Sequence, residues 1–163
     1  MALRSLSPDK AEQIFEQLTP EQQAAIENNL PAEVRAQWNV NRSFAEGSIG
    51  RLMEAVSATF LPDMTVGEAI EVLRDLVKKE FVTYGYIIDP AHKLLGVLVM
   101  RELLFADHHS KLCDVMLPNP FSLSADMPVM DAVKNVLSKH FPVYPITDTH
   151  GTLIGQIRGS RLF

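Results

Sequence analysis

The chain has 163 residues, of which 47% are hydrophobic and 21% charged, an ordinary composition for a globular protein with a real core. Fifteen basic and twenty acidic residues give a net charge of -5, which repels phosphate backbones and argues against a nucleic-acid partner. The longest apolar run, Leu94 to Met100, is far shorter than the roughly 18 residues of a membrane helix. A single cysteine, Cys113, and an N-terminus without the apolar stretch of a secretion signal favour a cytoplasmic location.

Residues 1–50 are predicted to form short helices, each with one apolar and one acidic face. Ser7-Pro8 marks one helix start, the capping box Thr19-Pro20-Glu21-Gln22 marks a second, and Pro31 marks a third. Apolar residues recur at helical spacing up to Trp38, for which we expect a packing role, with an exposed contact to a partner as the alternative. The segment carries four basic and seven acidic residues, a balance of -3, so most of the net charge lies here.

From residue 51 onward the sequence contains an internal repeat. The matching parts are Met53 with Met116 and Asp63–Ala69 with Asp126–Ala132, each shifted by 63 residues, and Tyr86–Asp89 with Pro145–Asp148, shifted by 59. A shift that falls from 63 to 59 places a shorter helix-to-strand loop in the second copy. Two copies of one structural unit are therefore predicted.

Each copy is predicted to run strand, helix, strand, turn, strand and short helix. The expected ranges are 57–60, 65–77, 83–88, 94–99 and 101–105 in the first copy, and 121–123, 129–138, 143–147, 152–158 and a start at Ser160 in the second. One such unit is too small to bury its sheet alone, so the two sheets should pack together and leave pseudo-twofold clefts for a ligand. The expected fold class is α+β, with a helical segment at 1–50, a first motif at 51–109 and a second at 110–163.

This tandem βαββα repeat, with Gly96-Val97-Leu98 and Gly155-Gln156-Ile157 leading into short helices, resembles a pair of cystathionine-β-synthase (CBS) motifs. The segment Phe44–Met53 is similar to the junction between the acidic helical domain and the CBS pair of MgtE-type magnesium channels, and segments 64–69 and 84–89 are also similar. The resemblance implies a homodimeric regulatory domain on the cytoplasmic side of the cell membrane. Such a domain is no enzyme; it senses intracellular Mg²⁺ and gates a membrane pore.

Two differences from that family bear on the expected partners. The helical segment is shorter than the family's full N-domain. The chain also stops at Arg161-Leu162-Phe163, before the connecting helix and membrane segments. It is expected to be either a soluble regulatory fragment, whose partner is the pore domain of the same polypeptide, or the product of a gene that ends here.

The alternative function is a stand-alone CBS regulatory protein that binds ATP or another adenine nucleotide. In nucleotide-binding CBS motifs, a hydroxyl residue near the end of the last strand and an acid three residues later bind phosphate and ribose. In the first copy a valine replaces the hydroxyl residue, whereas Arg101 and Glu102 keep a cation and an acid. In the second copy Arg158 and Arg161 occupy these places and no acid remains. Tyr84 is the candidate for stacking on a purine, although a core position is the common role of such a tyrosine.

Magnesium is usually held by one or two carboxylates and several waters, so its ligands form no tight sequence motif. The candidates are Glu46, Glu54, Asp126 and Asp131, together with Asp9, Glu12, Glu16, Glu27 and Glu33 on the acidic helices. Acidic surfaces repel one another when bare, and bound divalent ions would favour a compact state. Simple solvation of the helix faces is the alternative role of these acids.

No catalytic motif is recognised. His108, His109 and Cys113 lack the spacing of a zinc site, and neither a Ser/His/Asp arrangement nor a glycine-rich phosphate loop is present in the sequence. A purely structural dimerisation module is the remaining alternative to the two sensor functions.

Overall fold

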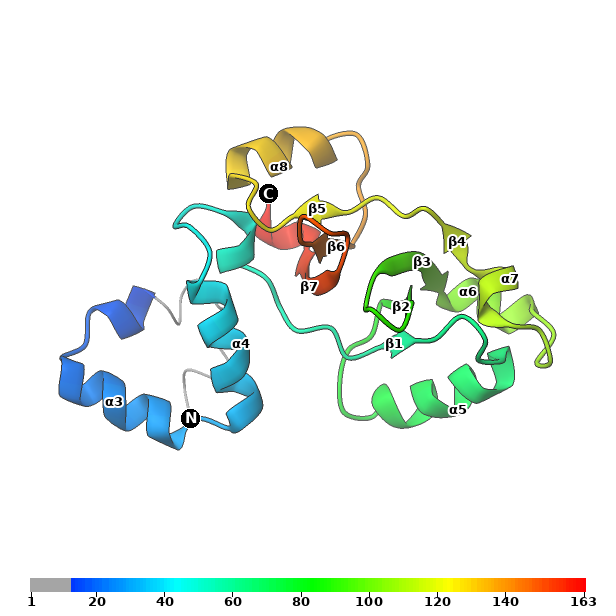
Figure 1. Ribbon diagram of the computed structural model, residues 1–163, viewed down its shortest axis with the longest axis horizontal. Coiled ribbons are helices and arrows are strands. Elements are labelled where there is room, and N and C mark those ends of the chain that lie inside the picture. The colour runs from blue at the N-terminus through cyan, green and yellow to red at the C-terminus, as the bar shows by residue number, and fades with distance from the viewer. Residues whose placement is uncertain (1–12) are drawn as a thin grey trace.

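The N-terminal part of the molecule is helical. The computed structural model describes residues 13–163, so Asp9, Glu12 and the predicted helix start at Ser7-Pro8 lie outside the described residues. Residues 13–16 are helical and are followed by α3 (Pro20–Asn29) and α4 (Ala32–Arg42). The predicted capping box begins α3: the Thr19 hydroxyl accepts from the Gln22 N–H, and the Gln22 side chain accepts from the Thr19 N–H. These helices project from one side of the molecule (Figure 1).

Aromatic packing holds the helical segment together. The buried Phe15 ring and the Trp38 ring meet edge to face with their centroids 4.5 Å apart, which confirms the packing role of Trp38. The Arg42 guanidinium lies over the Phe15 ring, 5.3 Å from its centroid, in a cation–π contact. Toward the rest of the molecule, the buried Asn41 side chain donates to the Met53 carbonyl at 2.9 Å. This bond attaches α4 to the segment that leads into the first motif.

The junction between helices and motifs is a tight turn built on two glycines. Gly47 has a φ of +79°, in the left-handed region that glycine adopts without strain. A Cβ at Gly50 would lie 2.4 Å from the Phe44 ring, so only glycine fits beneath that ring. The Arg51 Nε donates to the Phe44 carbonyl at 2.7 Å and closes the turn. The turn ends in the short helix η1 (Ile49–Arg51).

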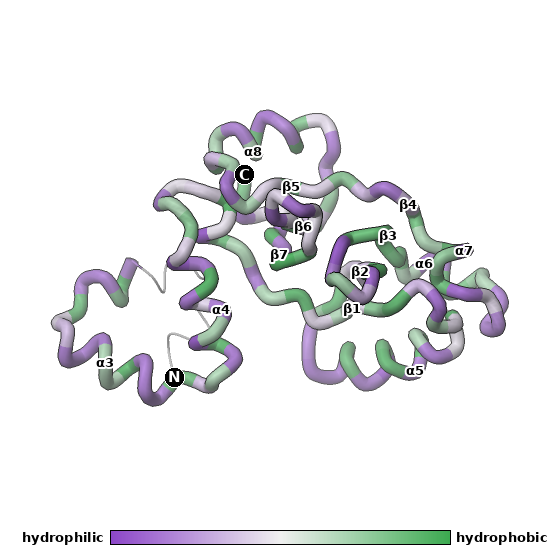
Figure 2. Tube along the Cα trace, in the orientation of Figure 1, coloured by the Kyte–Doolittle hydropathy of each residue, from purple (hydrophilic) through white to green (hydrophobic). Residues whose placement is uncertain are grey.

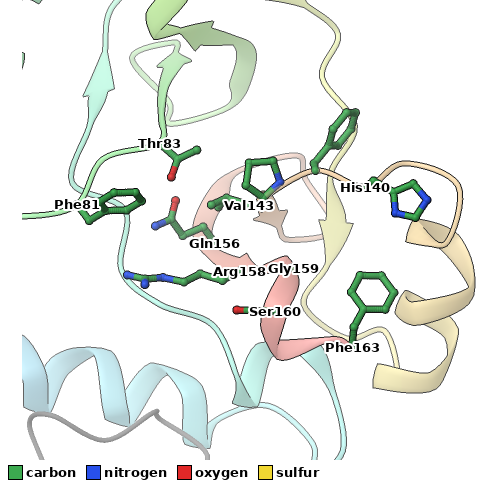
Figure 3. Close-up of a pocket in the computed structure, with 11 residues that line it drawn as sticks. Phe81, Thr83, His140, Val143, Gln156, Arg158, Gly159, Ser160 and Phe163 are labelled. Atoms are coloured by element: carbon green, nitrogen blue, oxygen red, sulfur yellow. The ribbon is translucent and has the colours of Figure 1, made fainter.

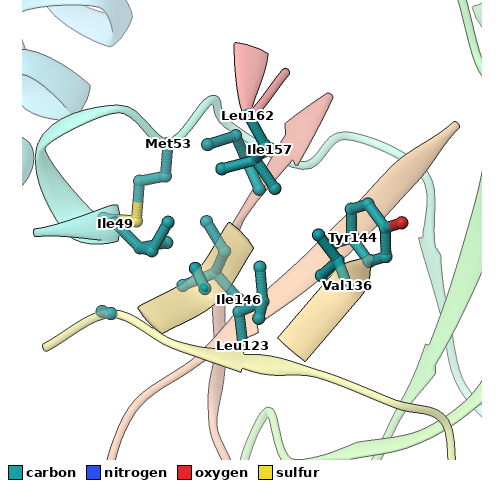
Figure 4. Packing of buried hydrophobic residues seen from close by; sticks show 10 residues of the cluster. Ile49, Met53, Leu123, Val136, Tyr144, Ile146, Ile157 and Leu162 are labelled. Carbon is teal, nitrogen blue, oxygen red and sulfur yellow. The ribbon is translucent and has the colours of Figure 1, made fainter. Parts of the chain in front are cut away.

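This junction belongs to the core of the second motif, not to that of the first. The Ile49 N–H donates to the Met127 carbonyl at 2.9 Å, and the Gly50 N–H donates to the Ala125 carbonyl at 2.8 Å. Ile49 and Met53 are fully buried among the hydrophobic residues of that motif (Figure 4). The junction therefore packs in the core of the second motif, and only after it does the chain enter the first motif.

The first motif contains a four-stranded sheet. Its strands, in spatial order, are β1 (Thr59–Phe60), β2 (Tyr84–Ile88), β3 (Leu94–Val99) and β4 (Leu117–Pro118), and its helices are α5 (Val66–Leu76), α6 (Met100–Phe105) and α7 (Leu112–Val115). β1 pairs parallel with β2, and the other pairs are antiparallel. The predicted capping box of Thr65 and Glu68 begins α5. The sequence did not predict α7 or β4, which are only four and two residues long.

The second motif repeats this arrangement with three strands. They are β5 (Leu123–Ser124), β6 (Val143–Thr147) and β7 (Leu153–Arg158), and the helices are α8 (Val129–Val136) and η2 (Gly159–Arg161). β5 pairs parallel with β6 and β6 antiparallel with β7, as β1, β2 and β3 do in the first motif. The strand and helix types agree with the predicted repeat, with ends that differ by up to two residues.

The two sheets pack against each other through their hairpins. At the turns, the Leu94 N–H donates to the Gly151 carbonyl at 3.1 Å and the Leu153 N–H donates to the His92 carbonyl at 2.9 Å. Tyr86, Ile88 and Leu153 form a shared hydrophobic cluster, as predicted for sheets too small to stand alone. Figure 2 shows hydrophobic residues on β3 and on parts of α5, and mostly hydrophilic residues along α3. Between residues 13 and 163, no helix combines the length and apolar character needed to cross a membrane.

Candidate functional site

An open cleft lies between the two motifs, beside the end of β7. Its inner part has a volume of about 290 Å³ and is lined by residues 54–58, residues 80–84, Gln156 and Arg158. Its outer part has a volume of about 500 Å³, shares four of these residues and adds residues 140–143, Gly159, Ser160 and Phe163. We call the two parts together the polar cleft.

An ion pair spans the inner part of the polar cleft. The Arg158 Nε donates to the Glu54 carboxylate at 3.3 Å, with the Glu54 side chain 23% and the Arg158 side chain 50% exposed. Glu54 and Gln156 also exchange backbone hydrogen bonds of 2.7 and 3.0 Å, so β7 holds the segment that carries the carboxylate. On the same wall, the Ser57 hydroxyl donates to the Glu80 carboxylate. The cleft is thus lined by groups that can bind phosphates and hydroxyls.

The side chains of the polar cleft are arranged on two sides of β7. Figure 3 shows Arg158, Gln156, Thr83 and Phe81 gathered on one side, whereas His140 and Phe163 lie on the other. Phe81 is 83% exposed and offers a flat apolar ring next to the Arg158 guanidinium. A cation beside an exposed aromatic ring suits a ligand that has both an anionic group and a planar group.

The internal repeat places a second, smaller cleft in the equivalent position of the first motif. Its volume is about 130 Å³, and its lining residues are Tyr84, Val97, Val99, Leu117, Pro120, Phe121, Phe141, Val143 and Pro145. Apart from the Tyr84 hydroxyl, the side chains described as lining it carry only carbon and hydrogen. We call it the apolar cleft.

The repeat relates the two clefts residue by residue. The 63-residue shift takes Glu54 to Leu117, and the 59-residue shift takes Arg158 to Val99. The backbone agrees, because Glu54 bridges to Gln156 in one cleft and Leu117 pairs with Val97 in the other. Each charged group of the inner ion pair thus has a hydrocarbon side chain as its counterpart. A polar ligand is expected in one cleft only.

The residues predicted for nucleotide binding are separated in the structure. Tyr84 is half-buried and lines both clefts. Burial, and after it the neighbouring Tyr144, raise the pKa of Tyr84, so its hydroxyl stays protonated at neutral pH. Arg101 and Glu102 are exposed in the first turn of α6 and line neither cleft.

The polar cleft lies beside the end of β7, where the CBS pattern of the second copy lacks an acid in the sequence. Its acid, Glu54, comes from the other end of the chain, 104 residues before Arg158. A residue-by-residue alignment of the two copies is the signal that could have found this site. At the cleft positions it pairs Glu54 with Leu117 and Arg158 with Val99.

The predicted metal ligands that lie within residues 13–163 do not form a cluster. Glu46 and Asp126 are exposed, Asp131 lies 4.0 Å from the Lys134 ammonium, and Glu54 pairs with Arg158. Of the acids on the helices, Glu16 and Glu33 are exposed and Glu27 pairs with Arg42 at 3.3 Å. Across residues 13–163, no three His, Cys, Asp or Glu side chains lie close enough to hold one metal ion.

The fold nevertheless brings the junction that carries Glu46 and the start of α8, which carries Asp131, side by side. The Val129 N–H donates to the Gly47 carbonyl at 2.9 Å, and Ser48 bridges to Pro128. Glu46 directly precedes Gly47, and Asp131 follows Val129 by two residues. Both acids are therefore close in sequence to this backbone contact between the junction and α8. One or two carboxylates with several waters are enough for a Mg²⁺ site.

Comparison with known proteins now defines the class. The family model of the CBS domain matches residues 49–109 and 112–162, so the chain belongs to the CBS domain family. Among curated proteins, the magnesium transporter MgtE of Thermus thermophilus is 26% identical over 133 residues, a match that covers 81% of this chain and 30% of that protein. MgtE transporters of two further bacteria also match, and the chain spans about a third of the length of these curated relatives.

Solved structures extend the likeness to the helical segment. The cytosolic domain of the Mg²⁺ channel MgtE in complex with ATP has a TM-score of 0.86 and 25% identity, over 97% of this chain and 65% of that chain. The soluble part of a magnesium transporter also has a TM-score of 0.86, with 21% identity over 98% of this chain and 63% of that chain. The predicted resemblance to the cytosolic region of MgtE and the predicted α+β fold with tandem CBS motifs are confirmed.

Proposed function

We propose that this chain is the cytosolic Mg²⁺-sensing domain of an MgtE-type transporter, which gates a membrane pore and carries out no chemistry itself. The observation that carries the proposal is the extent of the likeness. It includes the helical segment, the junction and both motifs, at a TM-score of 0.86 with an MgtE cytosolic domain. A likeness to a CBS pair alone would not include the helical segment or its attachment through Asn41.

Charge neutralisation supplies the mechanism of sensing. The chain has a net charge of -5, and acidic residues stand on the helices, at the junction near Glu46 and at the start of α8 near Asp131. Bound Mg²⁺ would lower the repulsion between these parts and favour their compact arrangement. A difference of about 1–3 kcal/mol in binding free energy between two states is enough for allosteric control.

A magnesium titration tests this function. We expect millimolar MgCl2 to raise the melting temperature and reduce the radius of gyration beyond the effect of NaCl at equal ionic strength. Glu46→Gln and Asp131→Asn should weaken the response. Glu71→Gln removes one carboxylate from the exposed face of α5 and serves as the matched control. Equal responses to MgCl2 and NaCl would rule out a specific Mg²⁺ site.

A further part of the proposal is a homodimer. Four apolar side chains on α6, on α8 and at the C-cap of α8 are 55% exposed or more: Leu104, Phe105, Met130 and Leu137. Leu104 and Phe105 are 82% and 81% exposed, which is costly in water and suits a surface covered by a second copy. Sedimentation should give a dimer for the wild-type chain and a monomer for Leu104→Ser/Phe105→Ser. A dimer that persists in this variant would place the interface elsewhere.

The membrane partner is tested at the level of the gene. If the reading frame continues beyond the codon for Phe163 into apolar stretches of about 20 residues, the pore is part of the same polypeptide. A stop codon at that place would require the pore, if there is one, to be a separate protein. It would also favour the alternative of a stand-alone regulatory protein.

A second candidate function is the binding of an adenine nucleotide in the polar cleft. Arg158 supports it as a partner for phosphate, and the exposed Phe81 ring as a surface for the base. The MgtE cytosolic domain crystallised with ATP is a relative whose complex is consistent with this ligand. Calorimetric titration with ATP should give one site per chain, because the apolar cleft offers no charged partner. Absence of heat at millimolar ATP would remove this function.

A further inference from the structure

Among the described residues that line the polar cleft, Arg158 is the only arginine or lysine, and its guanidinium already has an anionic partner. The Glu54 carboxylate accepts from the Arg158 Nε at 3.3 Å. With 23% of its side chain exposed, Glu54 is more enclosed than Arg158, at 50%. A phosphate group entering the cleft has to share the guanidinium with this carboxylate or displace it, because two anions at one guanidinium repel each other.

We propose that Glu54 is an internal competitor for the anionic ligand of the polar cleft, so that binding of a nucleotide phosphate at Arg158 releases the Glu54 carboxylate. This inference rests on the proposed nucleotide function and adds a regulation of that same site. Glu54 lowers the affinity for the ligand, and in return the ligand breaks a contact that the empty cleft maintains.

The position of Glu54 connects the ion pair to the helical segment. Glu54 directly follows Met53, whose carbonyl accepts the Asn41 side chain of α4 at 2.9 Å. Glu54 itself is joined to β7 by its two backbone hydrogen bonds with Gln156. The ion pair therefore lies one residue away from the attachment of the helical segment. Displacing the carboxylate changes the forces on the segment through which a signal from the cleft would reach the helices.

The chain offers its own controls for this role. Glu80 lines the same cleft, but its carboxylate accepts from Ser57 instead of pairing with Arg158. Replacing either glutamate by glutamine removes one negative charge from the cleft, and only Glu54→Gln also removes the competitor. In the apolar cleft, the counterparts Leu117 and Val99 form no such pair, so the competition is a property of one cleft only.

Titration calorimetry with ATP in EDTA tests the proposal on the wild-type chain, Glu54→Gln and Glu80→Gln. Removing a partly exposed ion partner should strengthen ATP binding by about two- to fivefold in Glu54→Gln. The gain in Glu80→Gln should be less than half as large. Both gains should shrink when NaCl is raised from 50 to 300 mM, because salt screens the charges. Inorganic tripolyphosphate should show the same order of affinities, since the competition concerns phosphate and not the base.

A second readout follows the helical segment. Trp38, the single tryptophan, lies on α4 three residues before Asn41, so its fluorescence reports on this segment. ATP should change the Trp38 emission of the wild-type chain, and Glu54→Gln should show part of that change without ligand. Thermal melts of all variants ensure that only folded proteins are compared.

The outcomes separate the two proposals. If the wild-type chain binds ATP and Glu54→Gln binds no more tightly than Glu80→Gln, the competition is wrong and the nucleotide function stands. If Glu54→Gln binds more weakly, Glu54 is a ligand-binding residue instead. If neither the wild-type chain nor Glu54→Gln binds ATP or tripolyphosphate, both proposals fail. Binding by Glu54→Gln alone would support competition at Arg158 and would remove nucleotide binding as a function of the wild-type chain.

Discussion

Met53 lies directly against Gly155, although the two residues belong to opposite ends of the CBS pair. A Cβ at Gly155 would be 2.8 Å from the Met53 sulfur and 3.0 Å from the Glu54 carbonyl oxygen. The repeat reproduces this contact, since a Cβ at Gly96 would be 2.4 Å from the Met116 sulfur. Each methionine lies near the start of one motif and packs on a glycine of the other. The two motifs are thereby interlocked through their leading segments, and neither core is complete without the other.

This contact predicts the effect of Gly155→Ala. The added methyl group would press on a flexible methionine and on a backbone carbonyl, so we expect a loss of about 1–3 kcal/mol in the free energy of unfolding. Chemical denaturation of Gly155→Ala, Met53→Ala and the double variant measures it. The double variant should lose less than the sum of the two single losses, because one side of the collision is gone. Additive losses would show that Met53 and Gly155 do not act on each other.

The Asn41 attachment predicts a selective loss of the helical segment. Asn41→Ala leaves the Met53 carbonyl without the amide that reaches it at 2.9 Å, which should cost about 1–3 kcal/mol. Trp38 fluorescence should then melt at a lower temperature than the circular dichroism signal of the whole chain. Asn39→Ala changes an exposed residue of the same helix and should leave both melts unchanged. Coincident melts in Asn41→Ala would mean that the segment and the motifs unfold as one unit.

The two candidate nucleotide positions predict opposite results for two substitutions. If ATP binds in the polar cleft, Arg158→Gln should weaken binding by about tenfold or more, because it removes a charge-assisted hydrogen bond to phosphate. Glu102→Ala, on α6 outside both clefts, should then change the affinity by less than about twofold. Titration calorimetry decides the matter. Loss of binding in Glu102→Ala with normal binding in Arg158→Gln would restore the position that the sequence favoured.

The sequence was sufficient for the fold because its signals are local. Capping boxes at Thr19 and Thr65 and a repeat of polar and apolar positions give the helix starts and the order of strands, and the structure follows them closely. The elements that were missed, α7 and β4, are too short to show a period. Met53 and Met116 each pack on the opposite motif, which the sequence did not predict. The spacing of a repeat does not show which copy a segment packs on.

The candidate site was harder to predict because its charged pair joins residues 104 positions apart. Arg158 was noticed at the end of its strand, but its partner Glu54 was assigned to a metal site, since both roles use a carboxylate. Tyr84 was placed in a cleft, as the structure shows, whereas Arg101 and Glu102 continue into an exposed helix turn. Sequence spacing fixes which residues end a strand, and packing of the opposite motif decides which of them a cleft encloses.

The hairpin turn of the second motif predicts a dependence of stability on pH. One oxygen of the Asp148 carboxylate accepts from the His150 N–H at 2.8 Å and from the Thr152 N–H at 3.0 Å. Slight burial alone would raise the pKa of Asp148, but the hydrogen bonds from His150 and Thr152 outweigh it and lower that pKa below its ordinary value. A carboxyl group with a lowered pKa in the folded state stabilises that state above the unfolded pKa of about 4. This contribution is lost as the pH falls through the folded value.

Asp148→Asn should therefore reduce the free energy of unfolding at pH 7 by less than about 1 kcal/mol, since the turn is partly exposed to water. The difference from the wild-type chain should stay constant between about pH 7 and pH 5 and shrink below about pH 4, where the wild-type carboxyl group takes up its proton. Urea denaturation across this range measures the difference. Asp75→Asn, on the exposed face of α5, is the control for the loss of one surface carboxylate. A gap between Asp148→Asn and the wild-type chain that grew below pH 4 would reverse the sign and contradict the hydrogen-bonded role of Asp148.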